Sequence, residues 1–417
     1  MLAVGAVLRA AVFASAASSP RRFWSPDDRE YLPIATHLHA SYVASSGSLF
    51  DLGLRRPPGY ALFIRGIFDV FGRHYAAVVV VQLLLSLLLI GVTFWLAGLF
   101  LRRNLALLAA GAVAIDPASI VFANQLLSET LFALLLTTAI GLLVVSVRGN
   151  SRAKATLAGL ALGLALLVRP IAEYVPLFVA VTLFVIAGRG KIVRLAVPIT
   201  LAFVLGFAVP AGSWVIRNYE KTGVPIVSTI DGYDMLQYRA VGALVEDGRP
   251  RYLAQHDVLV RLAPHVSPHD NAGRVSRAEL SVGLSILAEH PVGAFKSWLR
   301  GEGKLLAGPA RSETAVLLTG HPTVHQLWLH VIVIIDLLVT IALVVAAGVG
   351  AVGVGLRRIK DRTLWLIVVP AAYLIVISGG PEAYSRFRVP VTPLLAVLAA
   401  AAFTLLPSRS RSGFTAP

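Results

Sequence analysis

The chain has 417 residues, of which 57% are hydrophobic and only 14% charged. Its mean hydropathy of +0.76 excludes an ordinary soluble globular protein. It contains no cysteine, which excludes a disulfide framework, a thiolate nucleophile and a thiolate metal site. The formal net charge of +15 raises the possibility of nucleic-acid binding, but the positions of the charges argue against it.

Hydropathy predicts about ten membrane-spanning helices, because a run of roughly 20 apolar residues crosses a bilayer as a helix that satisfies its own backbone hydrogen bonds. The predicted spans lie near residues 2–18, 76–100, 105–123, 128–146, 155–169, 171–187, 195–215, 326–350, 364–379 and 391–406. We therefore predict an all-α polytopic membrane protein.

The first of these spans has one alternative interpretation. The small residues Ala14, Ser15 and Ala16 could belong to the cleavage site of a signal peptide. The segment lacks a positively charged beginning, however, and Arg9 interrupts its apolar run. We favour a retained first span.

Two longer hydrophilic segments divide the predicted core. Residues 19–75 follow the first span, and residues 216–325 precede the last three. Both contain apolar residues at near-helical spacing, which predicts short helices along the membrane surface. The resulting divisions are a transmembrane core over 1–215, with 19–75 as its first outer loop, the outer segment 216–325, and C-terminal helices with a short tail over 326–417.

The short loops between spans indicate the orientation. Basic residues collect in 101–104, 148–154, 188–194, 356–362 and the tail 408–413, where Asp361 is the only acid. The positive-inside rule places these segments and both termini in the cytoplasm, and 19–75 and 216–325 outside the plasma membrane. The basic charge is therefore a topology signal, and we expect no nucleic-acid partner.

Acidic residues cluster just outside the first span, in "SPDDREYLPIA". Asp27, Asp28 and Glu30 lie within four residues there. One interpretation is a solvated loop in which Ser25 or Asp27 caps a helix that begins near Asp28. Another is a functional site, because Glu129 also lies at the outer end of a span, where a carboxylate is costly unless it is paired or useful.

Arginines reach the same predicted face. Arg55 and Arg56 precede the turn "PPG", and Arg386 and Arg388 precede the last span. Transfer of a sugar from a lipid phosphate requires both residue types, since a carboxylate takes the proton of the acceptor hydroxyl and cations hold the departing phosphate.

With these pieces, the chain resembles the C-type (GT-C) membrane glycosyltransferases, in particular the branch of protein O-mannosyltransferases and lipid A aminoarabinose transferases. The resemblance rests on the order of "PDDREYLPIA", "RRPPGYALFIRGIFDVFG", "LLSETLFALLL", "GLALGLALLVRPIAEYVPL" and "SWVIRNYEKTGVPIVSTIDGYDML". It implies a hexosyl- or pentosyltransferase that uses a polyprenyl-phosphate sugar at the extracytoplasmic face. The acceptor would be a hydroxyl of a protein, lipid or glycan, and the reaction an inverting single displacement.

The resemblance also implies roles for the acids. Asp27, with Tyr31 four positions on, matches the general base of the first loop. The family often has Glu at the next position, where this chain has Asp28, so an acid is kept. Glu129 matches the second acidic position, which orients donor or acceptor.

For the lipid phosphate, the resemblance implies arginine contacts. Arg56 and Arg386 match family positions that face it, and Arg388 and Arg217 are further candidates. For Arg217, the anchoring of a span end is an equal alternative. Some relatives carry a divalent metal, which leaves a metal open here, although no residue is assigned to one.

Two charged pairs within or beside the spans are also expected. Arg169 and Glu173, four residues apart around Pro170, could pair with each other at an outer turn. Asp336, which lies within a span, should pair with another polar group. The rival functional class is a transporter or lipid flippase. Against it, the acids gather at one membrane face, and no matching pair of broken helices is present.

Overall fold

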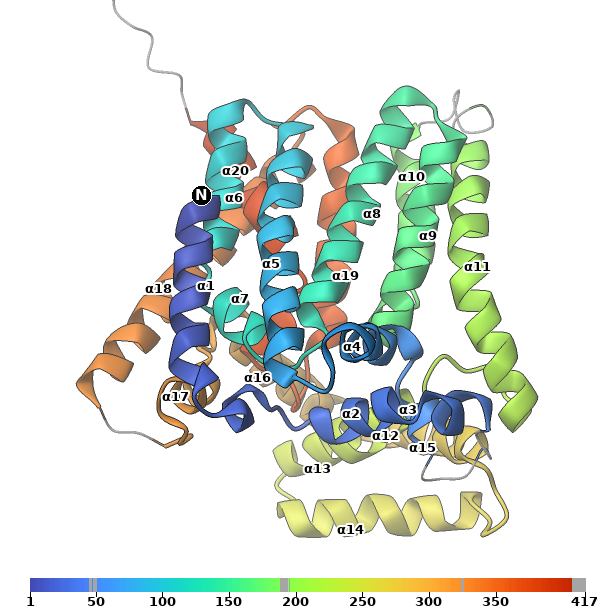
Figure 1. Cartoon of the computed structure of the whole chain (residues 1–417). Coiled ribbons are helices and arrows are strands. Elements are labelled where there is room, and N and C mark those ends of the chain that lie inside the picture. Colours follow the sequence, from blue (N-terminus) through green and yellow to red (C-terminus); the bar gives the residue numbers. More distant parts are fainter. Residues whose placement is uncertain (45–46, 48–50, 188–193, 195, 324–325, 407–417) are drawn as a thin grey trace, which may run out of the picture.

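The structure is a computed structural model that describes residues 1–44, 47, 51–187, 194, 196–323 and 326–406. Within these ranges the chain forms helices and no strand. Figure 1 shows an upright bundle with a layer of shorter helices against one end. The bundle helices are α1 (Leu2–Ala17), α5 (Tyr75–Gly98), α6 (Arg103–Ile115), α7 (Pro117–Ala123), α8 (Glu129–Gly149), α9 (Arg152–Val168), α10 (Val175–Ala187), α11 (Val197–Thr222), α18 (Leu327–Gly355), α19 (Trp365–Ser378) and α20 (Thr392–Ala402).

All ten predicted spans coincide with helices, apart from residue 195, which lies outside the described residues. Among the described helices, five are long and apolar enough to cross a membrane: α5, α8, α10 with the turn before it, α11 and α18. The pair α6 and α7, bent by 52° at its break, would make a sixth. The multi-pass membrane class is thus confirmed, and the count of about ten spans stays a prediction.

The bend between α6 and α7 has a local cause. Pro117 has no backbone N–H to continue the ladder and restricts the residue before it. Asp116 adopts an extended conformation there, and its carboxylate accepts a hydrogen bond from Ser119 N at 2.9 Å, which caps α7. The predicted continuous span over 105–123 is therefore a broken one.

Helices α9 and α11 approach each other through glycines. A Cβ atom added at Gly159 would lie 1.9 Å from Phe203 O, and one added at Gly206 would lie 2.1 Å from Thr156 O. Small residues allow this backbone contact, which is a common form of helix packing in membranes. It fixes the end of α9, where Arg169 follows.

Two further features tie the bundle together. Arg9 on α1 is buried and donates hydrogen bonds to Ser86 Oγ on α5 at 2.8 Å and to Ala114 O on α6 at 2.9 Å, so its charge inside a predicted span is satisfied. Helix α20 is buried from Thr392 through Ala401. The chain segment that leads into α20 is consequently held at a fixed place.

The layer at one end of the bundle comes from the two predicted outer segments (Figure 1). Its helices are α2 (Asp28–Thr36), α3 (Leu52–Arg55), α4 (Pro58–Phe71), α12 (Ile230–Tyr233), α13 (Val241–Glu246), α14 (Arg251–Leu262), α15 (Ala272–Glu289), α16 (Pro291–Ala307) and α17 (Arg311–Thr319). The expectation of helices in these segments is confirmed, and their position along the membrane surface stays a prediction.

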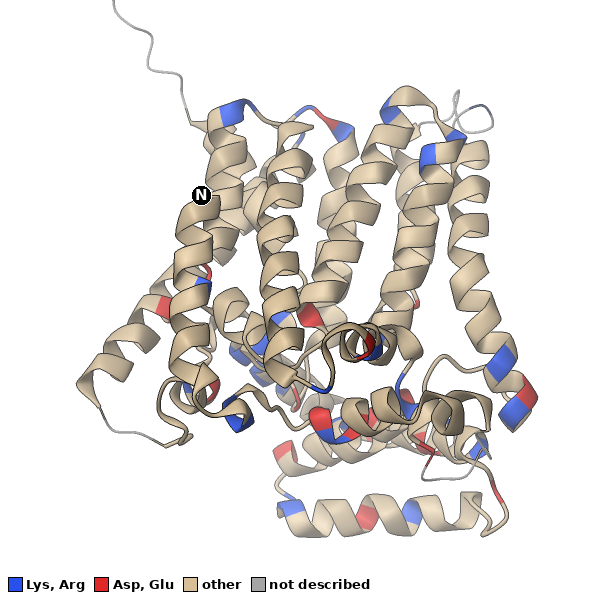
Figure 2. Ribbon diagram, viewed as in Figure 1, with Lys and Arg blue, Asp and Glu red and all other residues tan. Residues whose placement is uncertain are grey.

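Charged residues are distributed unevenly between the two ends (Figure 2). At the end away from the layer, the turns carry mainly Lys and Arg, whereas the layer mixes both signs. The predicted basic loop 188–194 and the tail from 408 lie outside the described residues except for Arg194.

Candidate active site

Arg386 links three parts of the chain. It lies in a short 3-10 turn, Ser385–Arg388, directly before the buried helix α20, and its side chain is only 7% exposed. Arg386 Nη2 donates to Asp27 Oδ2 in the first loop, and Nε donates to Glu129 Oε1 at the beginning of α8. The predicted base, the second acid and one predicted phosphate ligand are therefore in direct contact.

Arg56 holds the other oxygen of the same aspartate. Its Nη2 donates to Asp27 Oδ1 at 3.3 Å and its Nε to Glu30 Oε2, while the guanidinium lies 5.2 Å from the centre of the Tyr31 ring. The two prolines after it begin α4, because Pro58 occupies the first helical position, where no N–H is needed. The stiff turn thus positions Arg56 under α2.

Arg169 contacts Glu129, whereas the sequence predicted that it would pair with Glu173. Its Nη1 donates to Glu129 Oε1 and to Ser128 Oγ at 3.2 Å, whereas the predicted pair with Glu173 is not formed. The prediction is wrong because Arg169, before Pro170, is extended with φ −144° and ψ 124°, so the two residues do not share a helix face. The sequence predicted that Arg169 forms an ion pair, but it did not identify Glu129 on α8 as the partner.

These side chains form one chain of alternating charges, which we call the ion-pair network. Its members are Arg55, Glu30, Arg56, Asp27, Arg386, Glu129 and Arg169. They come from the first outer loop, the start of α8, the end of α9 and the turn before α20. Glu129 has no exposed side-chain surface, so its charge depends on its two arginines.

Adjacent aspartates have different environments. Burial would raise the pKa of Asp27, but the charges of Arg386 and Arg56 outweigh it and hold that pKa below its usual value. Burial raises the pKa of Asp28 to about 8, even though Ser25 N donates to its carboxylate at 2.7 Å. The expected cap by the side chain of Ser25 or Asp27 is wrong: α2 has no side-chain cap, and Asp28 bonds back to Ser25 instead.

We expect Asp28 to make the protein less stable as the pH rises. The folded state binds this proton more tightly than the unfolded chain, so the free energy of unfolding should fall between about pH 4 and pH 8. Asp28→Asn should remove this contribution and raise the melting temperature at pH 8 relative to wild type, with little change near pH 4. Thermal unfolding followed by tryptophan fluorescence at both pH values measures it, and an unchanged pH dependence in the variant would contradict it.

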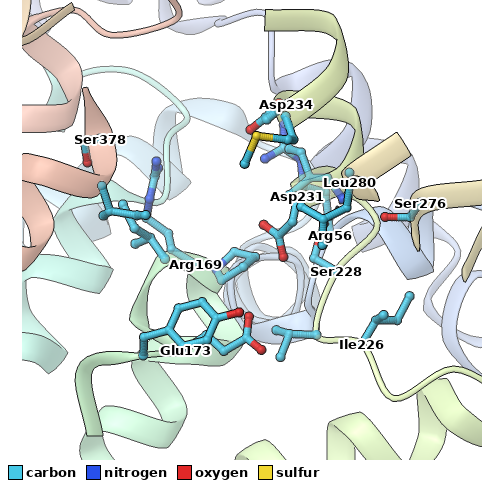
Figure 3. Close-up of a pocket in the computed structure, with 18 of the residues that line it drawn as sticks. Arg56, Arg169, Glu173, Ile226, Ser228, Asp231, Asp234, Ser276, Leu280 and Ser378 are labelled. Carbon is cyan, nitrogen blue, oxygen red and sulfur yellow. Dashed lines mark hydrogen bonds between the residues drawn. The ribbon is translucent and has the colours of Figure 1, made fainter. Parts of the chain in front are cut away.

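A cavity of about 480 Å³ lies beside the network. Arg56, Arg169 and Tyr31 contribute to its lining, together with residues of η3 (Pro170–Ala172), α12, α15 and α19, whereas Asp27, Glu129 and Arg386 are not among its described lining residues. Figure 3 shows Arg169 and Glu173 facing Asp231 across this space. The two arginines therefore lie between the cavity and the carboxylates.

Two other predicted phosphate ligands lie elsewhere. Arg388 is fully buried, and its Nη1 donates to Leu305 O at 2.8 Å on the side of α16. Arg217 donates to Tyr42 O at 2.7 Å and so ties the first outer loop to α11. Among the described residues, the printed partners of both arginines lie outside the ion-pair network, so neither belongs to the cluster around Asp27.

The expectation for Asp336 is confirmed. It accepts a hydrogen bond from Ala310 N at 2.8 Å and lies 3.7 Å from Arg388 Nη2. This buried group therefore contacts the turn before α20 through Arg388.

A divalent metal does not fit the residues around Asp27. In the described ranges, no three His, Asp or Glu side chains gather in a metal-binding arrangement. Both oxygens of Asp27 and Oε1 of Glu129 already accept from guanidinium groups. Because arginine supplies the positive charge between these carboxylates, we derive no chemical step through a metal.

Comparison with known proteins gives a family match over part of the chain. Residues 55–214 match the model of the dolichyl-phosphate-mannose-protein mannosyltransferase family. The matched segment contains Arg56, Glu129 and Arg169. No curated protein sequence matches the chain.

Solved structures share its fold. The archaeal oligosaccharyltransferase AglB from Archaeoglobus fulgidus, in complex with an inhibitory peptide and a dolichol-phosphate, matches over 97% of this chain with 14% identity and a TM-score of 0.57. The apo form of the A. fulgidus oligosaccharyltransferase matches with 12% identity and the same coverage and score. This chain spans half the length of those chains.

A structure of ArnT from Cupriavidus metallidurans bound to undecaprenyl phosphate matches over 96% of this chain and 76% of that chain, with 14% identity. Its TM-score of 0.39 is too low to support a shared fold by itself. The likeness to AglB shows that this chain shares the fold of the matched half of that oligosaccharyltransferase.

Proposed function

Because this chain has the fold of the C-type membrane glycosyltransferases and residues 55–214 match a mannosyltransferase family, we propose that it is a membrane glycosyltransferase. It moves a sugar from a polyprenyl-phosphate donor to a hydroxyl of a protein, lipid or glycan. The observation that carries the proposal is the ion-pair network beside the cavity. The dolichol-phosphate in the AglB complex supports a donor of this lipid class.

In the proposed reaction, Asp27 accepts the proton of the acceptor hydroxyl as its oxygen attacks the anomeric carbon. The bond from that carbon to the phosphate oxygen breaks, and its electron pair leaves with the polyprenyl phosphate. Arg56 and Arg386 stabilise this negative charge with fixed forks of donors. A single displacement inverts the configuration at the anomeric carbon.

Glu129 supports the arginines in this proposal. It is fully buried, and its Oε1 accepts from both Arg169 and Arg386. A carboxylate in this position orients two guanidinium groups toward one place. Its role is to hold the cations that face the donor rather than to react itself.

The segment 216–325 contributes the wall of the cavity opposite the bundle. Asp231, Asp234, Ser276, Arg239 and Arg277 belong to that wall, so it carries both signs of charge, and Arg56 and Arg169 line the side next to the network. We propose that the phosphate binds at the side next to the network and that the sugar and the acceptor meet the wall from 216–325. The divisions at 215 and 325 then separate a catalytic core from a substrate-facing segment.

The orientation follows from the charges. The turns at the end away from the network are basic, which favours a plasma-membrane protein with that end and both termini in the cytoplasm and the network outside. The rival function, transport or flipping of a lipid-linked substrate, is disfavoured because the described network lies at one end of the bundle rather than at its middle.

Cysteine labelling tests this orientation, and the native chain has no cysteine to interfere. Ala153→Cys at the exposed start of α9 should resist an impermeant thiol reagent in intact cells and react after permeabilisation. Gln255→Cys, exposed on α14, should react in intact cells and serves as the matched control. The reverse pattern would overturn the orientation.

The function itself is tested by removing the gene in the organism that carries it. Mass spectrometry of envelope proteins, lipids and glycans should show the loss of one sugar from one class of acceptor. Restoration by the wild-type gene, but not by a gene encoding Asp27→Asn, is the expected result. An unchanged envelope would contradict the proposal.

A further inference from the structure

Each group at the centre of the network is shared. The two oxygens of Asp27 accept from different arginines, Oδ1 from Arg56 and Oδ2 from Arg386. Arg386 is divided in turn between Asp27 and Glu129. In this arrangement the proposed base has a cation on each oxygen, and the proposed phosphate ligands have carboxylates on their donors. The base and the two arginines therefore occupy each other's hydrogen-bonding groups in the absence of donor.

The position of the cavity indicates from which side a phosphate would reach the network. Arg56 and Arg169 line it, whereas Asp27 is not among its described lining residues. The Arg56 side chain is 14% exposed, so it has some open surface. A phosphate that enters the cavity would therefore meet a guanidinium before it met the carboxylate.

Phosphate and carboxylate use the same donors of arginine. A guanidinium has five N–H groups in a fixed plane, and both anions bind it through parallel pairs of hydrogen bonds. Arg56 and Arg386 cannot give the same N–H groups to Asp27 and to a bound phosphate at once. A phosphate that binds through the N–H groups now given to Asp27 therefore replaces the carboxylate.

On the basis of the proposed function, we propose that the donor phosphate displaces Asp27 from Arg56 and Arg386, so that donor binding releases the base. The lipid-linked sugar must then bind before the acceptor hydroxyl can be activated. Asp27, freed of its two cations, faces the acceptor with both oxygens available, and the departing phosphate keeps the two arginines until it leaves. Without donor, the network returns to its paired state.

Glu129 acts in this exchange as a positioning residue. It holds Arg386 through Nε, which is a different nitrogen from the one that binds Asp27. Glu129 Oε2 is buried and has no hydrogen-bond partner, so it can accept a second donor as Arg386 turns toward the phosphate. The arginine therefore stays anchored when Nη2 changes partner.

The exchange is tested by binding of a short-chain polyprenyl phosphate to the purified full-length protein. Asp27→Asn should tighten binding about ten-fold or more, because the phosphate no longer competes with a charged group for the same donors. The matched control is Asp69→Asn, which has the same change of charge but removes an exposed partner of Arg65, and its binding should equal that of wild type. Unchanged or weaker binding by Asp27→Asn would overturn the exchange.

A double variant distinguishes the exchange of partners from a general electrostatic effect, in which the loss of a nearby negative charge alone strengthens phosphate binding. In an Arg386→Gln background, Asp27→Asn should lose most of its gain, since one of the arginines that it released is missing. A gain of full size in that background would be the general electrostatic effect and would also overturn the exchange.

The result that would contradict the proposed function differs from the results that would contradict the exchange. If Arg56→Gln and Arg386→Gln, each shown to be folded by thermal unfolding, both bind the polyprenyl phosphate as wild type does, there is no phosphate site at this network. If they bind more weakly but Asp27→Asn does not bind more tightly, the phosphate site stands and only the exchange is wrong.

Discussion

Asp27→Asn is expected to lower the turnover of sugar transfer by roughly 10²–10⁴, the usual contribution of a positioned general base. Asparagine keeps the size of the side chain and can still accept a hydrogen bond from Arg386, but it cannot take the acceptor proton. Expression and membrane insertion should be unchanged, because Asp27 lies in a loop before α2 and not in a span. The measurement is the initial rate of transfer by purified protein at saturating donor.

Two neighbours provide controls for this variant. Asp28→Asn and Glu30→Gln each replace an acid of the same short segment by its amide, but neither acid contacts Arg386. Both should retain most of the wild-type turnover. Wild-type turnover in Asp27→Asn would sink the mechanism, and a large loss in Asp28→Asn alone would move the base by one residue.

Arg386→Lys is expected to have the second-largest effect, a loss of about 10²–10³ in the rate of transfer, as for removal of one donor to a developing negative charge. Lysine keeps the positive charge but has a single ammonium group, which cannot reach Asp27, Glu129 and a phosphate in the way that a planar fork can. The loss should appear both in the apparent affinity for donor and in turnover.

The matched control is Arg65→Lys, the same exchange at an exposed arginine that pairs with Asp69 on α4. It should leave transfer unchanged. If Arg386→Lys transfers sugar as wild type does, then the turn before α20 has no part in donor binding, and the phosphate site must lie elsewhere.

The sequence predicted the main members of the site through topology. Asp27 and Arg56 lie in the first outer segment, Glu129 at the start of one span and Arg386 just before the last, and alternation of the spans assigns all four to one face. Next to Arg56, the stiff turn at Pro57 and Pro58 leaves the chain little freedom to turn away. The assignment to one face is why residues hundreds of positions apart could be grouped without coordinates.

The sequence could not predict which way neighbouring side chains face. Arg386 and Arg388 are two residues apart in a 3-10 turn with three residues per turn, so their side chains point to different sides. One meets Asp27 and the other meets the carbonyl of Leu305. A helix and a strand would point these two side chains in different directions. The apolar pattern in this stretch is too short to show which of the two it forms.

The sequence also could not predict which residue each charged side chain would pair with. Arg169 and Glu173 are spaced for a helical pair, but the extended residue before Pro170 breaks the helix between them, and Glu129 takes the arginine instead. Likewise, Asp116 and Pro117 turn one predicted span into two helices. In both places a proline changed the local geometry, and at Arg169 the contact that replaced the expected one came from a distant part of the chain.

The central claim is tested most directly by transfer in proteoliposomes. Purified protein is supplied with a polyprenyl-phosphate sugar labelled in the sugar, together with an acceptor extract from the membranes of the organism that carries the gene. We predict that labelled sugar leaves the lipid, appears in equal amount in the acceptor fraction, and releases free polyprenyl phosphate, and that Asp27→Asn abolishes most of this transfer. Movement of the intact labelled lipid across the bilayer without release of polyprenyl phosphate would contradict the account and indicate a flippase.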